Sequence, residues 1–313
     1  MNGEPISRRH ALQLGLLGAG SLAIGGIGLG AQGWPPFGST GPVEQTAAPG
    51  GRPVGARTLV EPAVVDSVDG TLDLDLRVAE SEVVVGGATV RMLTYNGTVP
   101  GPTLHLRPGD RLRVRLTNGL VEPTNLHTHG LEVTPTGSSD NPFLRIEPGE
   151  SLDYTIDLPT DHPSGVFWYH PHHHGTVADQ VFGGLYGAIV VDEESWEQAA
   201  PRVLVVSDVT FAGGRVAGVS RAERMHGRAG ETVLVNGQPA SVLTAREGSG
   251  HRLLLVNACT SRYLDLDLGG AAMLLRGLDG GHLAAPRPLD RLLLAPGNRA
   301  DLEVTVPASG AVL

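Results

Sequence analysis

Hydrophobic and polar residues alternate strictly over several stretches of this chain. In Thr71–Ala79 every second residue is Leu or Val, and charged residues lie between most of them. Arg111–Leu116 repeats the alternation with arginine at each polar position, and Ser151–Leu158 repeats it again. Side chains of a strand point alternately to its two faces, so this period of two predicts strands that bury one face.

The strand-like runs are short and turn residues separate them. Val83–Leu93 carries Gly86-Gly87 at a hairpin position, and Val166–His170 and Gly187–Val191 are further predicted strands. The 44 glycines and 23 prolines are consistent with a chain that turns often. Strands about every eight to twelve residues with such turns are typical of a β-sandwich or barrel. The sequence therefore predicts an all-β protein.

The same texture continues beyond about Pro201 and predicts a second β unit. We expect its strands at Val203–Val206, Thr232–Asn236, His251–Val256, Tyr263–Leu268, Met273–Leu278, Arg291–Leu294 and Ala300–Val306. We expect the charged segment Ser220–Gly230 to be a loop. No segment has a helical period of convincing length, apart from a short one near Glu193–Ala199.

The first residues have the pattern of an export signal. Ser7-Arg8-Arg9 precedes an uncharged run rich in Gly, Ala and Leu, which resembles a twin-arginine signal peptide over residues 1–32. Residues 33–57 are rich in Gly, Pro, Ser and Thr and are interpreted as a disordered linker. The alternative is an uncleaved membrane anchor, because no charged residue lies between Arg9 and Glu44.

Charge and cysteine content exclude two features, a nucleic-acid-binding surface and an internal disulfide. The formal net charge is −10 and the sequence has no lysine, so a nucleic-acid-binding surface is excluded. The arginines within Arg107–Arg115 are interpreted as the polar face of a strand. Cys259 is the single cysteine, which excludes an internal disulfide.

Two His-x-His pairs suggest a metal site. His127-Thr128-His129-Gly130 is followed about forty residues later by His170-Pro171-His172, and seven of the twelve histidines lie between residues 125 and 176. Residues i and i+2 of a strand share a face, so each pair presents two imidazoles on one side. If the two strands are neighbours, four imidazoles converge. Such a set suits Zn, Cu, Ni or Fe, and spacing does not choose among them.

The other histidines nearby are interpreted differently. His173 would face away from His172 on a strand, so we exclude it from the ligand set. His174 returns to the ligand face and is assigned at most an outer, supporting role. The alternative for all of them is ordinary surface or core histidine, which two such pairs within fifty residues make a poor explanation.

These residues resemble the multicopper oxidases, in particular the three-domain bacterial laccase-like members that include copper efflux oxidases and spore-coat laccases. The motifs that carry the resemblance are Tyr95-Asn96-Gly97, Pro100-Gly101-Pro102-Thr103, His127-Thr128-His129-Gly130, Trp168-Tyr169-His170-Pro171-His172, Gln180 with Gly183-Gly184-Leu185 and Gly187, Val235-Asn236-Gly237, Leu255–Cys259 and Asp279-Gly280-Gly281. The resemblance covers nearly everything after about residue 60.

The resemblance implies a fold and a domain order. It implies tandem cupredoxin-like Greek-key β-sandwich domains at residues 58–197 and 198–313, the second incomplete at its C-terminal end. The family's third domain, with a further H-x-H pair and an H-C-H motif, has no counterpart in these residues. Cys259 has no histidine neighbours and is expected to be a small buried side chain. We therefore expect this chain to be a fragment, a split subunit or a truncated product.

The resemblance also implies a trinuclear copper cluster that reduces O₂ to water by four electrons. His127 would bind the type-2 copper, His129 and His170 one type-3 copper, and His172 the other. In the family the electrons come from a type-1 copper that oxidises the substrate, and the ligands of that copper are missing from this sequence. A C-terminal cupredoxin domain or a complementing chain would have to supply them.

Asp140, in the loop after His129, has two interpretations. It resembles the family's acid near the cluster, which would deliver protons to reduced oxygen. Equally, it suits a turn aspartate before Asn141-Pro142. The sequence leaves both open.

Two function classes remain. The first is an exported copper-dependent oxidoreductase that oxidises phenolic or aromatic reductants or metal ions with O₂. The second is a copper-binding or copper-free cupredoxin scaffold of the cell envelope, without turnover of its own. Retention of His127, His129, His170 and His172 argues against a copper-free scaffold, which has no chemical need for them. The missing type-1 ligands favour a copper-binding chain that works only with a partner chain.

Overall fold

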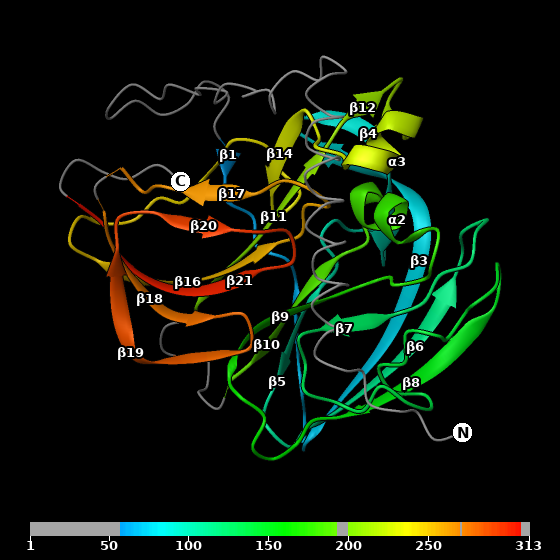
Figure 1. Ribbon diagram of the computed structural model, residues 1–313, viewed down its shortest axis with the longest axis horizontal. Helices are drawn as coiled ribbons and strands as arrows, with labels where there is room; N and C mark the ends of the chain where they lie inside the picture. The colour runs from blue at the N-terminus through cyan, green and yellow to red at the C-terminus, as the bar shows by residue number, and fades with distance from the viewer. Residues whose placement is uncertain (1–56, 193–199, 270, 308–313) are drawn as a thin grey trace, which may run out of the picture. The chain divides into compact units, whose positions relative to one another are not determined.

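The computed structural model is built from β-strands, which confirms the all-β prediction (Figure 1). It describes residues 57–192, 200–269 and 271–307. The predicted export signal, nearly all of the predicted linker and the short helix near Glu193–Ala199 lie outside the described residues. None of the helices in these described ranges is long and apolar enough to cross a membrane.

Two sheets that share one core form the first lobe. The five-stranded sheet has the order β2-β5-β10-β9-β7, and the six-stranded sheet has the order β12-β13-β4-β3-β6-β8. Their strands are β2 (Val64–Asp66), β3 (Thr71–Val85), β4 (Ala88–Tyr95), β5 (Thr103–Leu106), β6 (Arg111–Asn118), β7 (His127–His129), β8 (Ser151–Asp157), β9 (Gly165–His170), β10 (Gly187–Val191), β12 (Phe211–Ala212) and β13 (Arg215–Val216). Leu76, Leu112, Phe167 and Ile189 meet in the core between the sheets.

β6 shows how the alternation seen in the sequence is used. Its leucines and Val114 are buried, while its arginines are exposed along the other face. Arg111, Arg113 and Arg115 form ion pairs of 2.5 to 3.0 Å with aspartates of the neighbouring strands β3 and β8. The arginines are therefore matched by acids on the solvent face of the sheet, as the strand interpretation required.

A second lobe repeats the strand-and-turn pattern. Its six-stranded sheet has the order β14-β11-β16-β21-β18-β19, and β17 and β20 form a separate pair. The strands are β11 (Arg202–Val209), β14 (Thr232–Val235), β16 (Gly250–Asn257), β17 (Leu264–Leu266), β18 (Ala272–Leu278), β19 (Gly281–Leu289), β20 (Leu292–Leu294) and β21 (Arg299–Thr305). β1 (Arg57–Thr58), the first strand of the described residues, pairs with β15 (Ser241–Val242) of the later half. Cys259 is buried in the core of this lobe, as expected.

The two lobes share a structural repeat centred on Asn118 and Asn257. Each asparagine ends a strand, donates from its side-chain amide to two carbonyls, and accepts a backbone N–H from two residues ahead. The strand that follows is His127–His129 in the first lobe and Leu264–Leu266 in the second. The repeat thus places Leu-Asp-Leu in the second lobe where the first lobe has His-Thr-His.

Three expectations about elements were wrong. Arg221–His226 forms the helix α3 instead of a loop, because Ser220 accepts the backbone N–H of Glu223 and the Glu223 carboxylate accepts that of Ser220. A second helix, α2 (Val177–Gly183), was not predicted because it is only 7 residues long. β19 was missed because it is an exposed edge strand with Pro286 and Pro288, which break the sequence pattern.

Candidate metal centre

β7 and β9 bring the two histidine pairs together. They are adjacent antiparallel strands, with His127 opposite His170 and His129 opposite Trp168. β7 is the edge strand of its sheet, so its outer side pairs with no strand of the described residues. His127 and His129 are two residues apart and point to one face, where His170 also lies.

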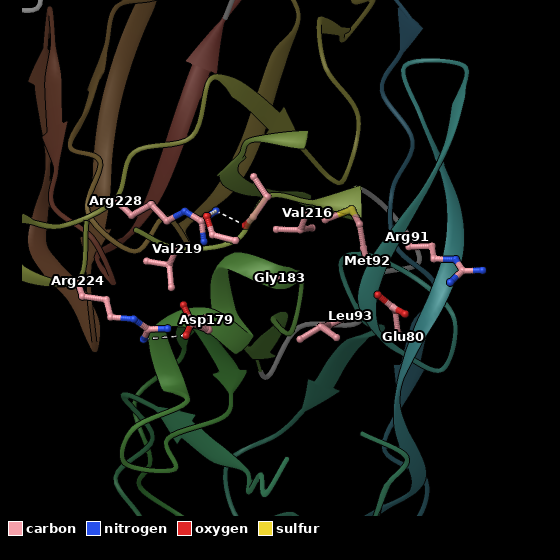
Figure 2. A pocket seen from close by; sticks show the side chains of 12 residues that line it. Glu80, Arg91, Met92, Leu93, Asp179, Gly183, Val216, Val219, Arg224 and Arg228 are labelled. Atoms are coloured by element: carbon pink, nitrogen blue, oxygen red, sulfur yellow. Dashed lines mark hydrogen bonds and ion pairs between the residues drawn. The ribbon is translucent and has the colours of Figure 1, made fainter. Parts of the chain in front are cut away.

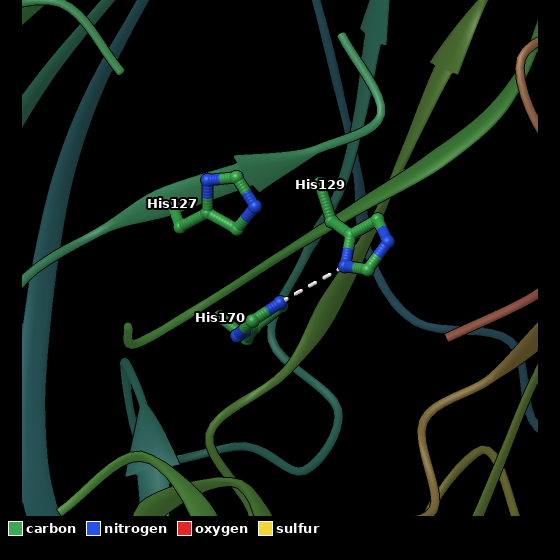
Figure 3. A group of neighbouring side chains, drawn as sticks. All are labelled: His127, His129 and His170. Atoms are coloured by element: carbon green, nitrogen blue, oxygen red, sulfur yellow. Dashed lines mark hydrogen bonds between the residues drawn. The ribbon is translucent and has the colours of Figure 1, made fainter. Parts of the chain in front are cut away.

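Three of the imidazoles surround a common space (Figure 3). The nitrogen atoms that His127, His129 and His170 offer to a ligand all lie within 4.8 Å of one another. His129 Nδ1 and His170 Nε2 face each other at 3.3 Å. The ring of His172, just beyond the end of β9, lies 5.1 Å from that of His127. Four imidazoles therefore converge, as the spacing predicted for neighbouring strands.

Asp140 fixes the orientation of the first of these rings. The same carboxylate oxygen lies 2.9 Å from His127 Nδ1 and accepts the backbone N–H of Thr128 at 2.9 Å. The bond to Asp140 gives the backbone N–H of Thr128 a partner on the outer edge of β7, where no strand of the described residues pairs. Because Nδ1–H of His127 donates to the carboxylate, Nε2 keeps its lone pair free for a metal.

The ring of His170 is held in the same manner by the backbone carbonyl of the next residue, Pro171. Its Nδ1 lies 2.8 Å from the carbonyl oxygen of Pro171, which can only accept. Nδ1 therefore carries the proton, and Nε2 faces the common space as an acceptor.

Asn125 supports the fourth histidine, and the sequence interpretation missed it. Its side-chain oxygen accepts the backbone N–H of His172 at 2.6 Å, and its amide donates to the carbonyls of Pro142 and Leu144. His172 Nδ1 is buried and has no hydrogen-bond partner among the described residues. The available sequence signal for this role was an asparagine placed directly before Leu126-His127.

The environment keeps three of these imidazoles, those of His129, His170 and His172, neutral. Burial lowers the pKa of His170 well below its usual value, with the neighbouring His127 as the next cause. Burial and then the positive charge of Arg299 lower the pKa of His129 to about 4. Burial followed by His127 also lowers the pKa of His172. Neutral imidazole is the form that binds a metal, so no proton has to be displaced near pH 7.

Aromatic and helical packing holds the histidine strands in place. The indole of Trp168 lies 5.0 Å from the ring of His129 and 4.1 Å from that of His170, so it packs beside both. On α2, Gln180 accepts the hydroxyl hydrogen of Thr124 at 2.8 Å and donates to the Pro123 carbonyl at 2.9 Å. α2 therefore anchors the turn that leads into β7.

The second lobe reaches the centre through the turn before β21. A Cβ atom added to Gly297 would lie 3.1 Å from His129 Cε1, so the turn lies directly against this ring. Arg299, the first residue of β21, donates to the carbonyl oxygen of Val166 on β9 at 3.3 Å. The sequence interpretation assigned no site role to either residue, because nothing in the local pattern links them to His129.

The remaining nearby histidines lie outside the converging group. His173 is half-buried and lies 3.4 Å from the Thr176 hydroxyl, and His174 is exposed with its ring 5.9 Å from that of His172. His162 is buried, accepts the backbone N–H of Glu132 at 3.0 Å and donates to its neighbouring Pro163 carbonyl. It fastens the loop that follows β7 and does not face the ligand space.

The donor set has a definite chemistry. Neutral imidazoles bind Cu, Zn, Ni and Fe, and the absence of carboxylate among the converging donors disfavours Ca²⁺ and Mg²⁺. Two of the rings are fixed by a partner on their second nitrogen, which is the usual arrangement at histidine metal sites. The residues therefore fit a metal with nitrogen ligands.

A hollow of about 310 Å³ lies apart from this centre, beside α2 and β4 (Figure 2). Its walls include Met92 and Leu93 on one side and Arg224 on another. Arg224 pairs with Asp179 at 3.0 Å, so that charge is already matched. None of the four converging histidines lines this hollow.

Comparison with known proteins finds a matching family model and several similar sequences. A family model described as "Multicopper oxidase" matches residues 77–195. The multicopper oxidase mco of Staphylococcus aureus is 33% identical over 68% of this chain and 48% of that protein. The cell division protein FtsP of Yersinia pestis is 30% identical over 69% of this chain and 47% of its own length.

Solved structures agree with the sequence comparisons. A structure described as a multicopper oxidase from Campylobacter jejuni, a metallo-oxidase, superposes with a TM-score of 0.73 at 30% identity. The match covers 80% of this chain and 54% of that one. The sheets of the chain are thus of the cupredoxin-like type. The chain spans about half the length of the curated relatives described above.

Proposed function

The chain belongs to the multicopper oxidase family of oxidoreductases, and on this basis we propose that it supplies one wall of a trinuclear copper cluster. The supporting observation is the convergence of four imidazoles on one face of β7 and β9, three of them with ligand atoms within 4.8 Å. Donor chemistry by itself leaves several metals open, and the family membership selects copper.

We assign the four ligands by their geometry and by the family pattern. His129 and His170 are proposed to share one type-3 copper, which their facing nitrogens 3.3 Å apart support. His172 is proposed to bind the other type-3 copper, and His127 the type-2 copper. Copper, when bound, supplies one-electron redox chemistry toward O₂.

The protein residues around the cluster are proposed to orient the ligands and to handle protons. Asp140 holds the Nδ1 proton of His127, and the Pro171 carbonyl holds that of His170. Asp140 is largely buried and in direct contact with a proposed ligand, so we also propose it as the carboxylate that relays protons to reduced oxygen. Trp168 shields the rings of His129 and His170 on one side.

The activity of the whole protein follows from this assignment as a proposal. It would oxidise a small phenolic or aromatic reductant, or a low-valent metal ion, with O₂ as the acceptor. The ligands beyond these four histidines would come from a C-terminal cupredoxin domain or from a complementing chain. The Ser7-Arg8-Arg9 motif supports export by the twin-arginine route to the periplasm, the envelope or the medium.

Copper titration of the full chain tests the proposal. Metal-free protein is loaded with Cu(II), and the unbound copper is removed. The copper that stays bound is then measured by elemental mass spectrometry. We expect His127→Gln and His170→Gln to lose bound copper, whereas His251→Gln, at a histidine paired with Ser249, retains it. Copper that binds equally well to all three variants would contradict the assignment.

One observation favours a second function. FtsP of Yersinia pestis, a cell division protein by name, is as similar to this chain as some of the oxidases are. A cupredoxin scaffold of the envelope without turnover is therefore the competing proposal. Absence of stoichiometric copper in the full chain would support the scaffold, because such a protein does not need the metal.

A further inference from the structure

Arg299 is a buried cation that joins the second lobe to the histidine centre. Only 4% of the residue is exposed. Its Nε donates to the Val166 carbonyl of β9 at 3.3 Å, and its Nη1 donates to the Asp279 carboxylate and the Gly297 carbonyl, both at 3.1 Å. One guanidinium therefore bonds to the strand that carries His170 and to the turn that lies on His129.

The other end of this guanidinium occupies the space above Gly130. A Cβ atom added to Gly130 would lie 2.2 Å from Arg299 Nη2, so a side chain there cannot coexist with the arginine as placed. Gly130 directly follows His129. Arg299 thus packs on the backbone beside one proposed ligand and bonds to the strand of another.

The positive charge of Arg299 interacts electrostatically with any metal bound by the neighbouring histidines. A guanidinium stays protonated at every physiological pH, so the positive charge is permanent. Burial weakens the screening of this charge by water and salt. A permanent cation disfavours the more positive state of a neighbouring metal, which is Cu(II), relative to Cu(I).

We propose that Arg299 is a positioning residue of the histidine centre that also sets its charge, fixing His129 through Gly130 and His170 through Val166 and favouring the reduced state of the bound metal. The inference rests on the proposed copper function. It goes beyond that function because it assigns a role in the centre to a residue of the second lobe, which contributes no ligand.

The experiment compares the affinities of the metal-free full chain for Cu(II) and Cu(I), measured by competition with chromophoric chelators. Arg299→Met removes the charge, and we expect the ratio of Cu(I) to Cu(II) affinity to fall about tenfold, which is about 59 mV for a one-electron couple. Arg299→Lys keeps the positive charge but cannot make all of the guanidinium's hydrogen bonds to Val166, Asp279 and Gly297. It should keep the ratio near that of the parent protein while changing the electron paramagnetic resonance spectrum of bound Cu(II).

Two further variants separate the charge effect from loss of structure. Arg252→Met removes a half-buried arginine of the second lobe, paired with Asp192 and Asp301 at 2.9 and 3.0 Å, and should lower the melting temperature without changing the affinity ratio. Asp279→Asn removes the negative charge that partners Arg299 and should shift the ratio in the opposite direction, toward Cu(I).

The outcomes are distinguishable. An unchanged ratio in Arg299→Met, or an equal shift in Arg252→Met, overturns the inference and leaves the proposed function intact. If Arg299→Met does not fold, a ratio in Asp279→Asn that stays at the parent value or moves toward Cu(II) overturns it. A parent chain that binds no copper overturns the proposed function together with the inference.

Discussion

Removal of the Asp140 carboxylate should weaken both the fold and the metal centre. In the native protein one carboxylate oxygen accepts from His127 Nδ1 and from the Thr128 backbone, each at 2.9 Å. Asp140→Ala deletes both bonds. It also leaves the N–H of Thr128, a residue only 1% exposed, without a partner.

The magnitude follows from these contacts. A hydrogen bond to a charged group contributes about 1.5–3 kcal/mol, and an unpaired buried N–H costs about 1–3 kcal/mol. Because the two terms overlap, we expect the free energy of unfolding to fall by about 3 kcal/mol. Loss of the group that orients a metal-bound histidine lowers metal affinity by about 10- to 100-fold, and we expect this range for Cu(II). Asp140→Asn keeps an acceptor oxygen and should lose only about 1 kcal/mol of stability.

Urea denaturation of the metal-free chain and Cu(II) titration calorimetry measure the two effects. Asp110→Ala is the matched control, because Asp110 is also a buried aspartate and accepts the Arg107 backbone N–H at 2.7 Å, in a turn that contains none of the four converging histidines. It should lower stability but leave Cu(II) affinity unchanged. Our reasoning is refuted if Asp140→Ala binds Cu(II) as tightly as the parent, or if Asp110→Ala weakens binding equally.

Three other perturbations give separate expectations. Asn125→Ala removes the acceptor of the His172 N–H, so Cu(II) affinity should fall about tenfold and the free energy of unfolding by about 2 kcal/mol, measured by calorimetry and urea denaturation. Gly297→Ala places a Cβ 3.1 Å from His129 Cε1 at a backbone φ of +82°, so it should lower the melting temperature by several degrees and alter the spectrum of bound Cu(II). Stability should also depend on pH: the pKa of His129 is lowered to about 4 in the folded state, so the unfolded chain binds more protons between about pH 6.5 and 4. The free energy of unfolding of the metal-free chain should therefore fall as pH drops through that window, and a flat profile in urea denaturation at pH 7, 6, 5 and 4 would argue against it.

Sequence reasoning worked best where a local period carries the information. The alternation in Arg111–Leu116 predicted a half-buried strand, and β6 has that burial pattern because a strand turns every second side chain inward. It failed for short or exposed elements. The capping-box residues Ser220 and Glu223 mark the start of α3, but without an apolar period the helix was read as a loop.

The sequence by itself determined the chemistry of the centre. Two His-x-His pairs on strand-forming segments place two imidazoles on one face wherever those strands lie, because that depends only on the geometry of the residues between them. The pairing of β7 with β9, which makes the four rings meet, is a long-range contact that no local pattern specifies.

Only the tertiary structure decided what surrounds those rings. Asp140 could have been a proton donor or a simple turn residue, and its contact with His127 became visible only when the loop folded back on β7. Arg299 is 170 positions beyond His129, yet it packs on the backbone of Gly130, the residue after that histidine. Burial and fixed charges act through space, so the neutral state of His129 depends on residues, such as Arg299, that the chain order does not place near it.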